Sequence, residues 1–331
     1  MAVNIKDVAR IAGVSTATVS HVINDTRFVT DATKKNVLEA MAKLDYHPNQ
    51  VARSLRSQKS RTVGLLIPDI SSFYFTGVAE GIEFALRKSG YHMILSNSHE
   101  SIEDEKDMIK VFNSQIVEGM IIAPAAGNHS YLNNYLRGNC PVVFIDRKPV
   151  GFEGDCVVLD NIKSTYDAVN LLISKGHKRI GLVLGSQLIS TTVERITGYK
   201  MALSENKIDI DEGLIKTGDF KIDSGYQITK DLVAKEKATA LFLASDTLAI
   251  GAMEYLKENG IQIPEKVAII SCNDFKWTQI STPALTVVSQ PSYELGVKAA
   301  EVLLSRINNP GKKTKFKDFR LPTKIIVRES C

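Results

Sequence analysis

Polar and aromatic side chains recur directly after short apolar runs beyond residue 61 of this chain. They can hydrogen-bond hydroxyls or cover C–H faces, and they are Ser72, Tyr74, Phe75, Asp146, Arg147, Thr191, Arg195, Phe220, Ser245, Asp246, Asn273 and Gln290, with Ser71, Phe73 and Asp274 beside them. Taken singly, each is more typical of a helix cap, a surface charge or a core aromatic. Taken together, they favour a pocket for a small polyhydroxylated molecule, because arginine, carboxylate and amide groups make paired hydrogen bonds.

The elements that would position these side chains are alternating strands and helices. Eight apolar runs read as strands: TVGLLIP (62–68), HMILSN (92–97), GMIIAP (119–124), VVFID (142–146), CVVLD (156–160), RIGLVLG (179–185), ALFLAS (240–245) and KVAIIS (266–271). Amphipathic stretches such as 77–89, 164–175 and 224–234 separate most of them. This alternation predicts parallel sheets covered on both faces, which bind ligands at the carboxyl ends of their strands. A region of about 270 residues is long enough for two such lobes.

The first 47 residues predict three short helices instead. Asn4, Ser15 and Thr30 are placed to cap them, and Gly13 ends the first. The apolar positions expected to face inward are Ile5, Val8, Ala9 and Ala12, then Val19, Val22 and Ile23, then Val37, Leu38, Met41 and Leu44. Two helices joined by a tight turn are typical of a helix-turn-helix, although helical spacing alone fits any pair of packed helices.

The open face of the second helix carries small side chains. Thr16, Ala17, Thr18, Ser20 and His21 offer hydroxyls, a methyl group and an imidazole, which fit a DNA groove. Residues 1–61 hold ten Lys or Arg and five acids, whereas the whole chain has a net charge of only +4. The basic excess is therefore local, as binding to a polyanion requires.

Residues 4–61 resemble the DNA-binding headpiece of the lactose-repressor/galactose-repressor (LacI/GalR) family. The resemblance covers the helix-turn-helix, the VIN that closes its second helix, and YHPNQVARSLRSQKS (46–60); within the family, STATVSHVINDTRFV is most similar to purine and ribose repressors. It implies that Thr16, Ala17 and His21 read bases, and that Thr18 and Ser20 contact phosphates. Asn24, at the end of VIN, is a further DNA-binding candidate. Alanine at 17 departs from the larger polar residue often found there and cannot make a bidentate bond to a base.

Residues 48–61 are the expected hinge or linker. The segment has only two sizeable apolar side chains, so burial alone cannot hold it as a helix, and its composition also fits a solvated linker. The family resemblance implies a hinge helix that orders on DNA. Leu55 would then wedge into the minor groove, Ala52 would let two hinge helices approach, and Arg53 and Arg56 would reach the sugar-phosphate edges.

The remaining chain resembles the family's effector domain, which is similar to periplasmic sugar-binding proteins. The expected fold is therefore α/β, with a three-helix helix-turn-helix headpiece (1–47), the hinge (48–61) and a two-lobed effector-binding and dimerisation domain of parallel sheets (62–331). The N-lobe is expected at about 62–160 and 291–320, and the C-lobe at about 161–290 and 321–331. The chain would cross between lobes near Asp160, Gln290 and Leu321.

Several expected ligand positions depart from the ribose-binding pattern. Ser72 and Ser245 stand where longer amides are usual, and Asn273 stands where a carboxylate is usual, which suits a larger or differently hydroxylated ligand. Ile189 stands where purine repressors carry a purine-binding arginine, so a nucleobase would lose a buried hydrogen bond. A pentose or hexose is the favoured effector, and a purine is the alternative.

Other chemistry is not indicated. Cys140, Cys156, Cys272 and Cys331 lack CxxC spacing and fit reduced thiols, and the six histidines show no metal-ligand pattern. The sequence has no nucleophile elbow, phosphate loop or dinucleotide motif, so we expect no catalytic residue, no metal and no cofactor. It also lacks a signal core and any apolar run near the ~18 to 20 residues of a membrane span, which predicts a cytoplasmic protein.

Two functions from different classes remain open. The favoured one is a sequence-specific regulator, a repressor, that binds a pseudo-palindromic double-stranded operator as a homodimer and changes its DNA affinity when a small effector binds. The alternative is a sugar-binding module or enzyme with an incidental basic extension. The lack of a catalytic constellation counts against turnover.

Overall fold

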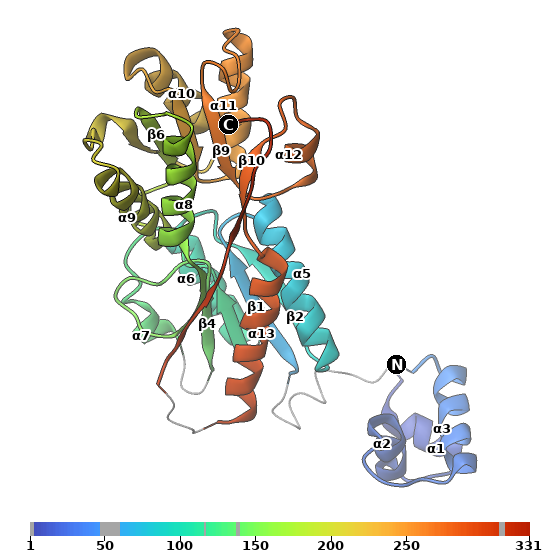
Figure 1. The fold of residues 1–331 in the computed structure, drawn as a ribbon. Coiled ribbons are helices and arrows are strands. Elements are labelled where there is room, and N and C mark those ends of the chain that lie inside the picture. Colours follow the sequence, from blue (N-terminus) through green and yellow to red (C-terminus); the bar gives the residue numbers. More distant parts are fainter. Residues whose placement is uncertain (1–2, 47–59, 116, 137–139, 311–314) are drawn as a thin grey trace. The chain divides into compact units, whose positions relative to one another are not determined.

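A helical unit and an α/β unit make up this chain in its computed structural model. The structure describes residues 3–46, 60–115, 117–136, 140–310 and 315–331 (Figure 1). The helical unit lies within residues 1–60, and the α/β unit spans residues 61–331. The predicted fold class, helices followed by two sheets of mainly parallel strands, is confirmed.

The helical unit contains α1 (Ile5–Ala12), α2 (Thr16–Asn24) and α3 (Asp31–Lys43). The predicted caps are confirmed, because the side chains of Asn4, Ser15 and Thr30 each accept a hydrogen bond from an amide in the first turn that follows. Gly13 ends α1 with a left-handed backbone (φ 67°), which glycine adopts without strain.

A small apolar core holds these three helices together. Its buried members are Val8, Ala9, Val19, Val22, Val37 and Ala40. The prediction for Leu38 was wrong, since its side chain is 51% exposed while that of Ala40 is 3% exposed. The buried stripe of α3 runs through residues three or four apart, at 37, 40, 41 and 44, and position 38 falls beside it.

The first sheet of the α/β unit has six parallel strands in the order β11-β5-β4-β3-β1-β2. Its strands are β1 (Thr62–Ile67), β2 (His92–Asn97), β3 (Gly119–Ile122), β4 (Val142–Ile145), β5 (Asp155–Leu159) and β11 (Asp318–Leu321). On one face pack α5 (Phe73–Lys88) and α13 (Ser292–Asn308), and on the other α6 (Ile102–Ser114) and α7 (Leu132–Tyr135). Neighbouring strand residues such as Leu65 and Leu66 are therefore buried in different cores.

The second sheet has the order β12-β10-β9-β8-β6-β7. Its strands are β6 (Ile180–Leu184), β7 (Ile215–Thr217), β8 (Ala240–Leu243), β9 (Ala268–Cys272), β10 (Thr286–Ser289) and β12 (Lys324–Ile326). The helices of this half are α8 (Asn161–Ser174), α9 (Ser190–Glu205), α10 (Ile222–Lys230), α11 (Asp246–Glu258) and α12 (Lys276–Ile280), with short turns at Glu212–Leu214 and Asp231–Lys235. Only β12 runs antiparallel to its neighbour in this sheet as described.

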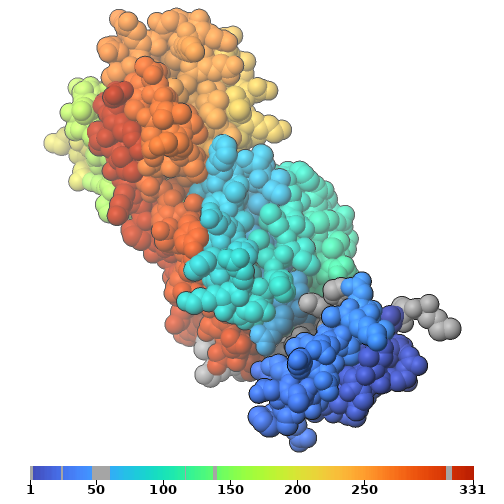
Figure 2. Space-filling model, turned by 90° about the vertical axis from the view of Figure 1, so that its right-hand side faces the viewer, coloured from blue at the N-terminus to red at the C-terminus, as the bar shows by residue number. Residues whose placement is uncertain are grey.

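The chain passes from one sheet to the other three times: between β5 and α8, between β10 and α13, and between β11 and β12 (Figure 1). Both halves of residues 61–331 consequently contain late parts of the sequence, and Figure 2 shows red and orange surface on each of them. We call them the N-lobe (first sheet) and the C-lobe (second sheet). No helix in the described part of the chain is long and apolar enough to cross a membrane.

Candidate functional site

The predicted DNA-reading side chains lie on α2. Thr16 and Ala17 are exposed in its first turn, while Thr18, Ser20 and His21 are half-buried. The opposite side of the helix packs into the core through Val19 and Val22. This packing leaves the face with the hydroxyls, the methyl group and the imidazole open to a partner.

His21 is held by a residue beyond the end of α2. Its Nδ1 lies 2.8 Å from Oγ1 of Thr26. Asp25 adopts a left-handed backbone (φ 50°), which turns the chain back so that the Thr26 amide donates to the carbonyl of His21 at 3.4 Å. With Nδ1 engaged, Nε2 is the ring nitrogen that remains for another partner.

The structure describes little of the other predicted DNA-contacting residues. Asn24 is the last residue of α2. Ala52, Arg53, Leu55 and Arg56 fall in 47–59, outside the described residues, and their roles stay predictions.

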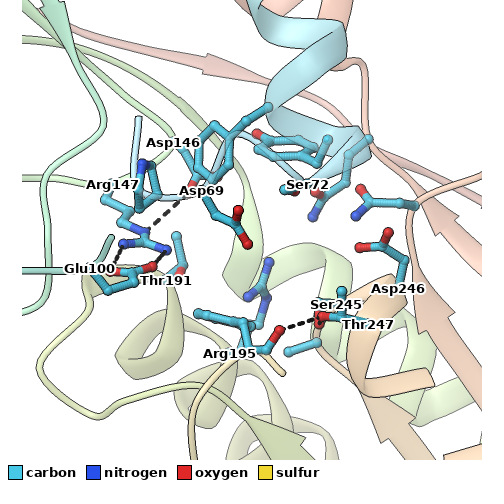
Figure 3. Close-up of a pocket in the computed structure, with 17 residues that line it drawn as sticks. Asp69, Ser72, Glu100, Asp146, Arg147, Thr191, Arg195, Ser245, Asp246 and Thr247 are labelled. Atoms are coloured by element: carbon cyan, nitrogen blue, oxygen red, sulfur yellow. Dashed lines mark hydrogen bonds and ion pairs between the residues drawn. The ribbon is translucent and has the colours of Figure 1, made fainter. Parts of the chain in front are cut away.

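All twelve predicted effector residues line one pocket, which holds about 560 Å³ including space open to solvent. The N-lobe and the C-lobe both contribute to it (Figure 3). Aromatic and polar side chains that converge from both lobes suit a small ligand. The neighbouring candidates Ser71, Phe73 and Asp274 are not among the lining residues, and Asp274 instead pairs with Arg328 at 2.6 Å.

The N-lobe side combines aromatic rings with a carboxylate. Tyr74 and Phe75 lie in the first turn of α5, with ring centroids 5.2 Å apart in an edge-on arrangement. Burial raises the pKa of Tyr74 well above its ordinary value, and the neighbouring Asp146 adds to the effect, so the hydroxyl stays neutral. Burial also raises the pKa of Asp146, although the guanidinium groups of Arg147 and Arg195 oppose this.

Arg147 follows β4 and is fixed by an ion pair within the N-lobe. Its Nη1 and Nη2 donate to the two carboxylate oxygens of Glu100 at 2.8 and 2.7 Å (Figure 3). Nη1 also donates to the carbonyl of Pro124 at 3.1 Å. The guanidinium carbon lies 5.8 Å from the centre of the Phe220 ring, so this N-lobe cation contacts a C-lobe aromatic.

The C-lobe side presents side chains from the amino-terminal turns of two helices. Thr191 and Arg195 project from α9 and are 3% and 5% exposed. Ser245 caps α11 by accepting from the amide of Leu248 at 3.2 Å. Thr247 donates to the carbonyl of Phe220 at 2.6 Å, which ties the aromatic wall of the pocket to α11.

Several polar atoms of the pocket are buried without a hydrogen-bond partner among the described residues. They are Nε of Arg195, Nε of Arg147, Oδ1 of Asn273 and Nε2 of Gln290. Asp246 is 3% exposed, and burial raises its pKa, opposed by the backbone amides at the start of α11 and by Asn273. Since buried polar groups are normally paired, these donors and acceptors are suited to a ligand that carries hydroxyls.

Five lining residues escaped the sequence prediction: Pro68, Asp69, Glu100, Ala244 and Thr247. Asp69 and Glu100 could have been predicted by the same rule as the other pocket residues, because they follow β1 and β2 at the carboxyl ends of those strands. Ile189 is buried and is not among the lining residues.

No other reactive centre stands out in the described ranges. They contain no group of three or more His, Cys, Asp or Glu side chains placed to hold a metal ion. All four cysteines are free, and burial raises the pKa of Cys140 to about 11 and that of Cys156 to about 12, so neither is a ready nucleophile.

Comparison with known proteins relates both units to one family. Residues 4–49 match the bacterial regulatory proteins of the lacI family, and residues 169–331 match a periplasmic binding protein-like domain. The chain is 36% identical over 333 residues to the HTH-type transcriptional repressor PurR of Vibrio atlanticus, covering 98% of each chain. It is 38% identical over 335 residues to the HTH-type transcriptional regulator RegA of Clostridium acetobutylicum, covering 100% of each.

Solved structures agree with these relatives. The lac repressor dimer bound to operator and the anti-inducer ONPF has a TM-score of 0.87 at 26% identity, covering 100% of this chain and 99% of that one. A LacI family transcriptional regulator from Enterococcus faecium with bound ribose has a TM-score of 0.73 at 33% identity, covering 81% of this chain and 98% of that one. The chain therefore belongs to the lacI family of bacterial regulatory proteins, and it is a DNA-binding transcriptional regulator controlled by a small ligand.

Proposed function

We propose that this regulator is a cytoplasmic repressor, not an enzyme, that binds its operator as a homodimer and responds to a small uncharged sugar in the pocket between its lobes. The observation that carries the proposal is the pocket lining, which joins aromatic walls to unpaired buried donors and acceptors. The ribose-bound relative from Enterococcus faecium supports a sugar at this place.

A ligand in this pocket would contact both lobes at once. Asp146 and Arg147 belong to the N-lobe, whereas Arg195 and Asp246 belong to the C-lobe. The two lobes already meet beside the pocket, where the amide of Lys148 donates to Oγ of Ser190 at 2.8 Å. A ligand that bridges them stabilises one relative arrangement of the lobes, and it shifts the DNA-binding equilibrium by its difference in affinity for the two arrangements.

On the DNA side, we assign residues 1–47 to base reading and residues 48–61 to a hinge, with Leu55 as the wedge. Two headpieces of a dimer would read half-sites of a pseudo-palindrome about one helical turn apart. Replacing Leu55 with Ala should then weaken specific binding and reduce the bend of the operator. Unchanged affinity and bending would remove the wedge from this assignment.

The effector is tested by a thermal-shift screen of the full chain against pentoses, hexoses, their phosphates and purines. We expect an uncharged sugar to raise the melting temperature, since a ligand that binds only the folded state stabilises it by mass action. A response to purines alone would make a purine the effector, as the alternative holds. Turnover of a bound sugar would indicate an enzyme.

The site itself is tested through Arg195. Replacing Arg195 with Ala should abolish the response to the sugar while leaving operator binding in sugar-free buffer intact. Lys200→Ala is the matched control, because Lys200 lies on the same helix, is half-buried and pairs with Glu212 away from the pocket. Loss of operator binding in Arg195→Ala without sugar would make Arg195 a structural residue.

A further inference from the structure

The pairing of Glu100 with Arg147 determines which donors the pocket offers. A guanidinium has five N–H groups. Two are used by the carboxylate of Glu100, and a third is used by the carbonyl of Pro124. The donors that remain are Nε–H and one N–H of Nη2. These two N–H bonds are parallel and lie on one edge of the guanidinium.

This remaining pair is available to a ligand. Nε of Arg147 lies 3.4 Å from Oδ2 of Asp146, a charge contact without hydrogen-bond geometry, and it has no hydrogen-bond partner in the described part of the chain. The Arg147 side chain is only 5% exposed and rests against the Phe220 ring. A ligand would meet a fixed two-donor fork that suits two adjacent acceptor oxygens.

The loop that carries Glu100 is held in an uncommon backbone conformation. His99 (φ 51°) and Glu100 (φ 58°) are consecutive left-handed residues, and neither is glycine. The His99 amide donates to Oδ1 of Asn97 at 3.1 Å, and its Nδ1 lies 3.2 Å from Oδ2 of Asp104. Strain of this kind persists where surrounding contacts impose it, and here it aims Glu100 at Arg147.

The positive charge of Arg147 is already neutralised by the carboxylate of Glu100. The pocket lining of the described chain has four carboxyl groups, on Asp69, Glu100, Asp146 and Asp246, and two guanidinium groups, on Arg147 and Arg195. An additional anion could pair with Arg195, which has no ion-pair partner among the described residues, but it would also lie among these four carboxyl groups. Burying an anion beside carboxyl groups costs more than burying a hydroxyl that is hydrogen-bonded.

We propose that Glu100 is a specificity-determining residue, which occupies the end of Arg147 with the protein's own carboxylate and thereby restricts the pocket to uncharged ligands. The inference rests on the proposed ligand site and adds a rule for its chemistry. Ligands with a carboxylate or phosphate are rejected because Glu100 already holds the position such a group would take. Uncharged ligands with two neighbouring oxygens are accepted by the side fork.

The test compares pairs of probes that differ in charge but little in size, namely D-glucose with D-glucuronate and D-galactose with D-galacturonate. It uses the full chain, with calorimetric affinities at constant ionic strength. Sulfate against chloride is a third probe, read as the change in melting temperature, and it does not depend on which sugar binds. We expect wild-type protein to bind the hexose at least tenfold tighter than its uronate and to show no more than the general stabilisation that sulfate gives folded proteins relative to chloride.

Three variants separate charge from fit. Glu100→Gln should reduce the hexose preference by about tenfold or more and create a sulfate response, as expected when one charge-assisted hydrogen bond changes partner. Glu100→Asp keeps the charge and should keep the rejection of anions even if affinity falls. Glu103→Gln removes a charge from an exposed residue one turn along, paired with Lys106, and should behave as wild type. Melting temperatures without ligand establish that each variant folds.

The outcomes distinguish this inference from the proposed function. If a neutral sugar binds but Glu100→Gln changes neither the preference nor the sulfate response, the role of Glu100 is overturned and the sugar site stands. If no neutral sugar binds wild-type protein, the proposed effector is overturned. In that case the sulfate comparison of wild type and Glu100→Gln still decides the role of Glu100.

Discussion

Asp146 and Asn273 occupy equivalent points in the two sheets and share a left-handed backbone. Asp146 (φ 63°) follows β4 and donates its amide to the carbonyl of Val157 in β5 at 3.0 Å. Asn273 (φ 75°) follows β9 and donates its amide to the carbonyl of Val288 in β10 at 2.9 Å. Because β4 and β9 hold the same place in their sheets, each lobe supplies the pocket with one polar side chain on the same kind of turn.

Replacing Asn273 should separate backbone strain from ligand contact. Ala at a left-handed position costs about 1 to 2 kcal/mol, a penalty that Gly does not carry. We expect Asn273→Ala to unfold at lower urea than Asn273→Gly, and both to lose the response to the effector. Equal stability of the two variants would contradict the strain, and a retained response would remove the amide from the site.

The crossing of α5 and α13 should not tolerate an added methyl group. A Cβ on Gly296 would lie 2.1 Å from the carbonyl oxygen of Val78, and one on Gly81 would lie 2.1 Å from that of Tyr293. Gly296→Ala should therefore lower the free energy of unfolding by about 1 to 3 kcal/mol, because the backbones must move apart. Urea denaturation followed by circular dichroism measures this change.

Gly77→Ala is the matched control on α5. A Cβ there would lie 2.5 Å from the hydroxyl of Ser292, which can rotate away, and 3.4 Å from the Cβ of Ser292, an ordinary contact. Because Ala favours a helix interior over Gly by about 1 kcal/mol, we expect this variant to be as stable as wild type or more so. Equal losses in the two variants would mean that the close crossing is not the cause.

Thr26 should tune DNA reading through His21. Thr26→Val removes the hydroxyl that lies 2.8 Å from Nδ1 of His21, whereas Thr26→Ser keeps one. Loss of one hydrogen bond, about 1 kcal/mol, predicts about fivefold weaker operator binding for the Val variant and little change for the Ser variant. Fluorescence anisotropy with labelled operator measures both. Equal affinities for the Val and Ser variants would count against orientation of His21 by Thr26.

Stability should fall in mild acid because of His129. Its side chain is 2% exposed, its Nδ1 accepts from the amide of Val150 at 3.2 Å, and burial lowers its pKa below the ordinary 6.5. The folded state thus binds fewer protons than the unfolded state as pH falls through 6.5. The unfolding free energy should decrease there by up to about 1.4 kcal/mol per pH unit from this group.

The contribution of His129 is isolated by substitution. In urea denaturation between pH 7 and 5, His129→Gln should show a shallower loss of stability than wild type. His92→Gln replaces an exposed imidazole and should keep the wild-type slope. An unchanged slope in His129→Gln would assign the acid sensitivity to other groups.

Much of the pocket was predictable because parallel strands end at one edge of a sheet. That rule, together with the family resemblance, placed twelve side chains that the fold does bring together. It could not indicate that Arg147 pairs with Glu100, since 47 residues separate them and only the packing of β2 beside β1 brings the β2–α6 loop to the pocket.

Weak local patterns account for the other differences. The edge strands β7, β11 and β12 have three or four residues each, too few for a period to show. The predicted helix over 224–234 was only partly right, because α10 ends at Lys230 and a π-turn follows at Asp231–Lys235. Burial of Leu38 was predicted from its apolar side chain alone. Its angular position on the helix, beside the buried stripe, was not considered.

The last crossing between the lobes has a consequence for how the protein is made. Residues 318–326 supply an edge strand to both sheets, and α13, which packs on α5, is translated after β6–β10 of the other lobe. On the ribosome, the lobe that emerges first is thus completed only after most of the other lobe has been made. The face of the first lobe that α13 covers stays exposed while most of the second lobe is synthesised. The nascent chain therefore cannot fold strictly one lobe at a time.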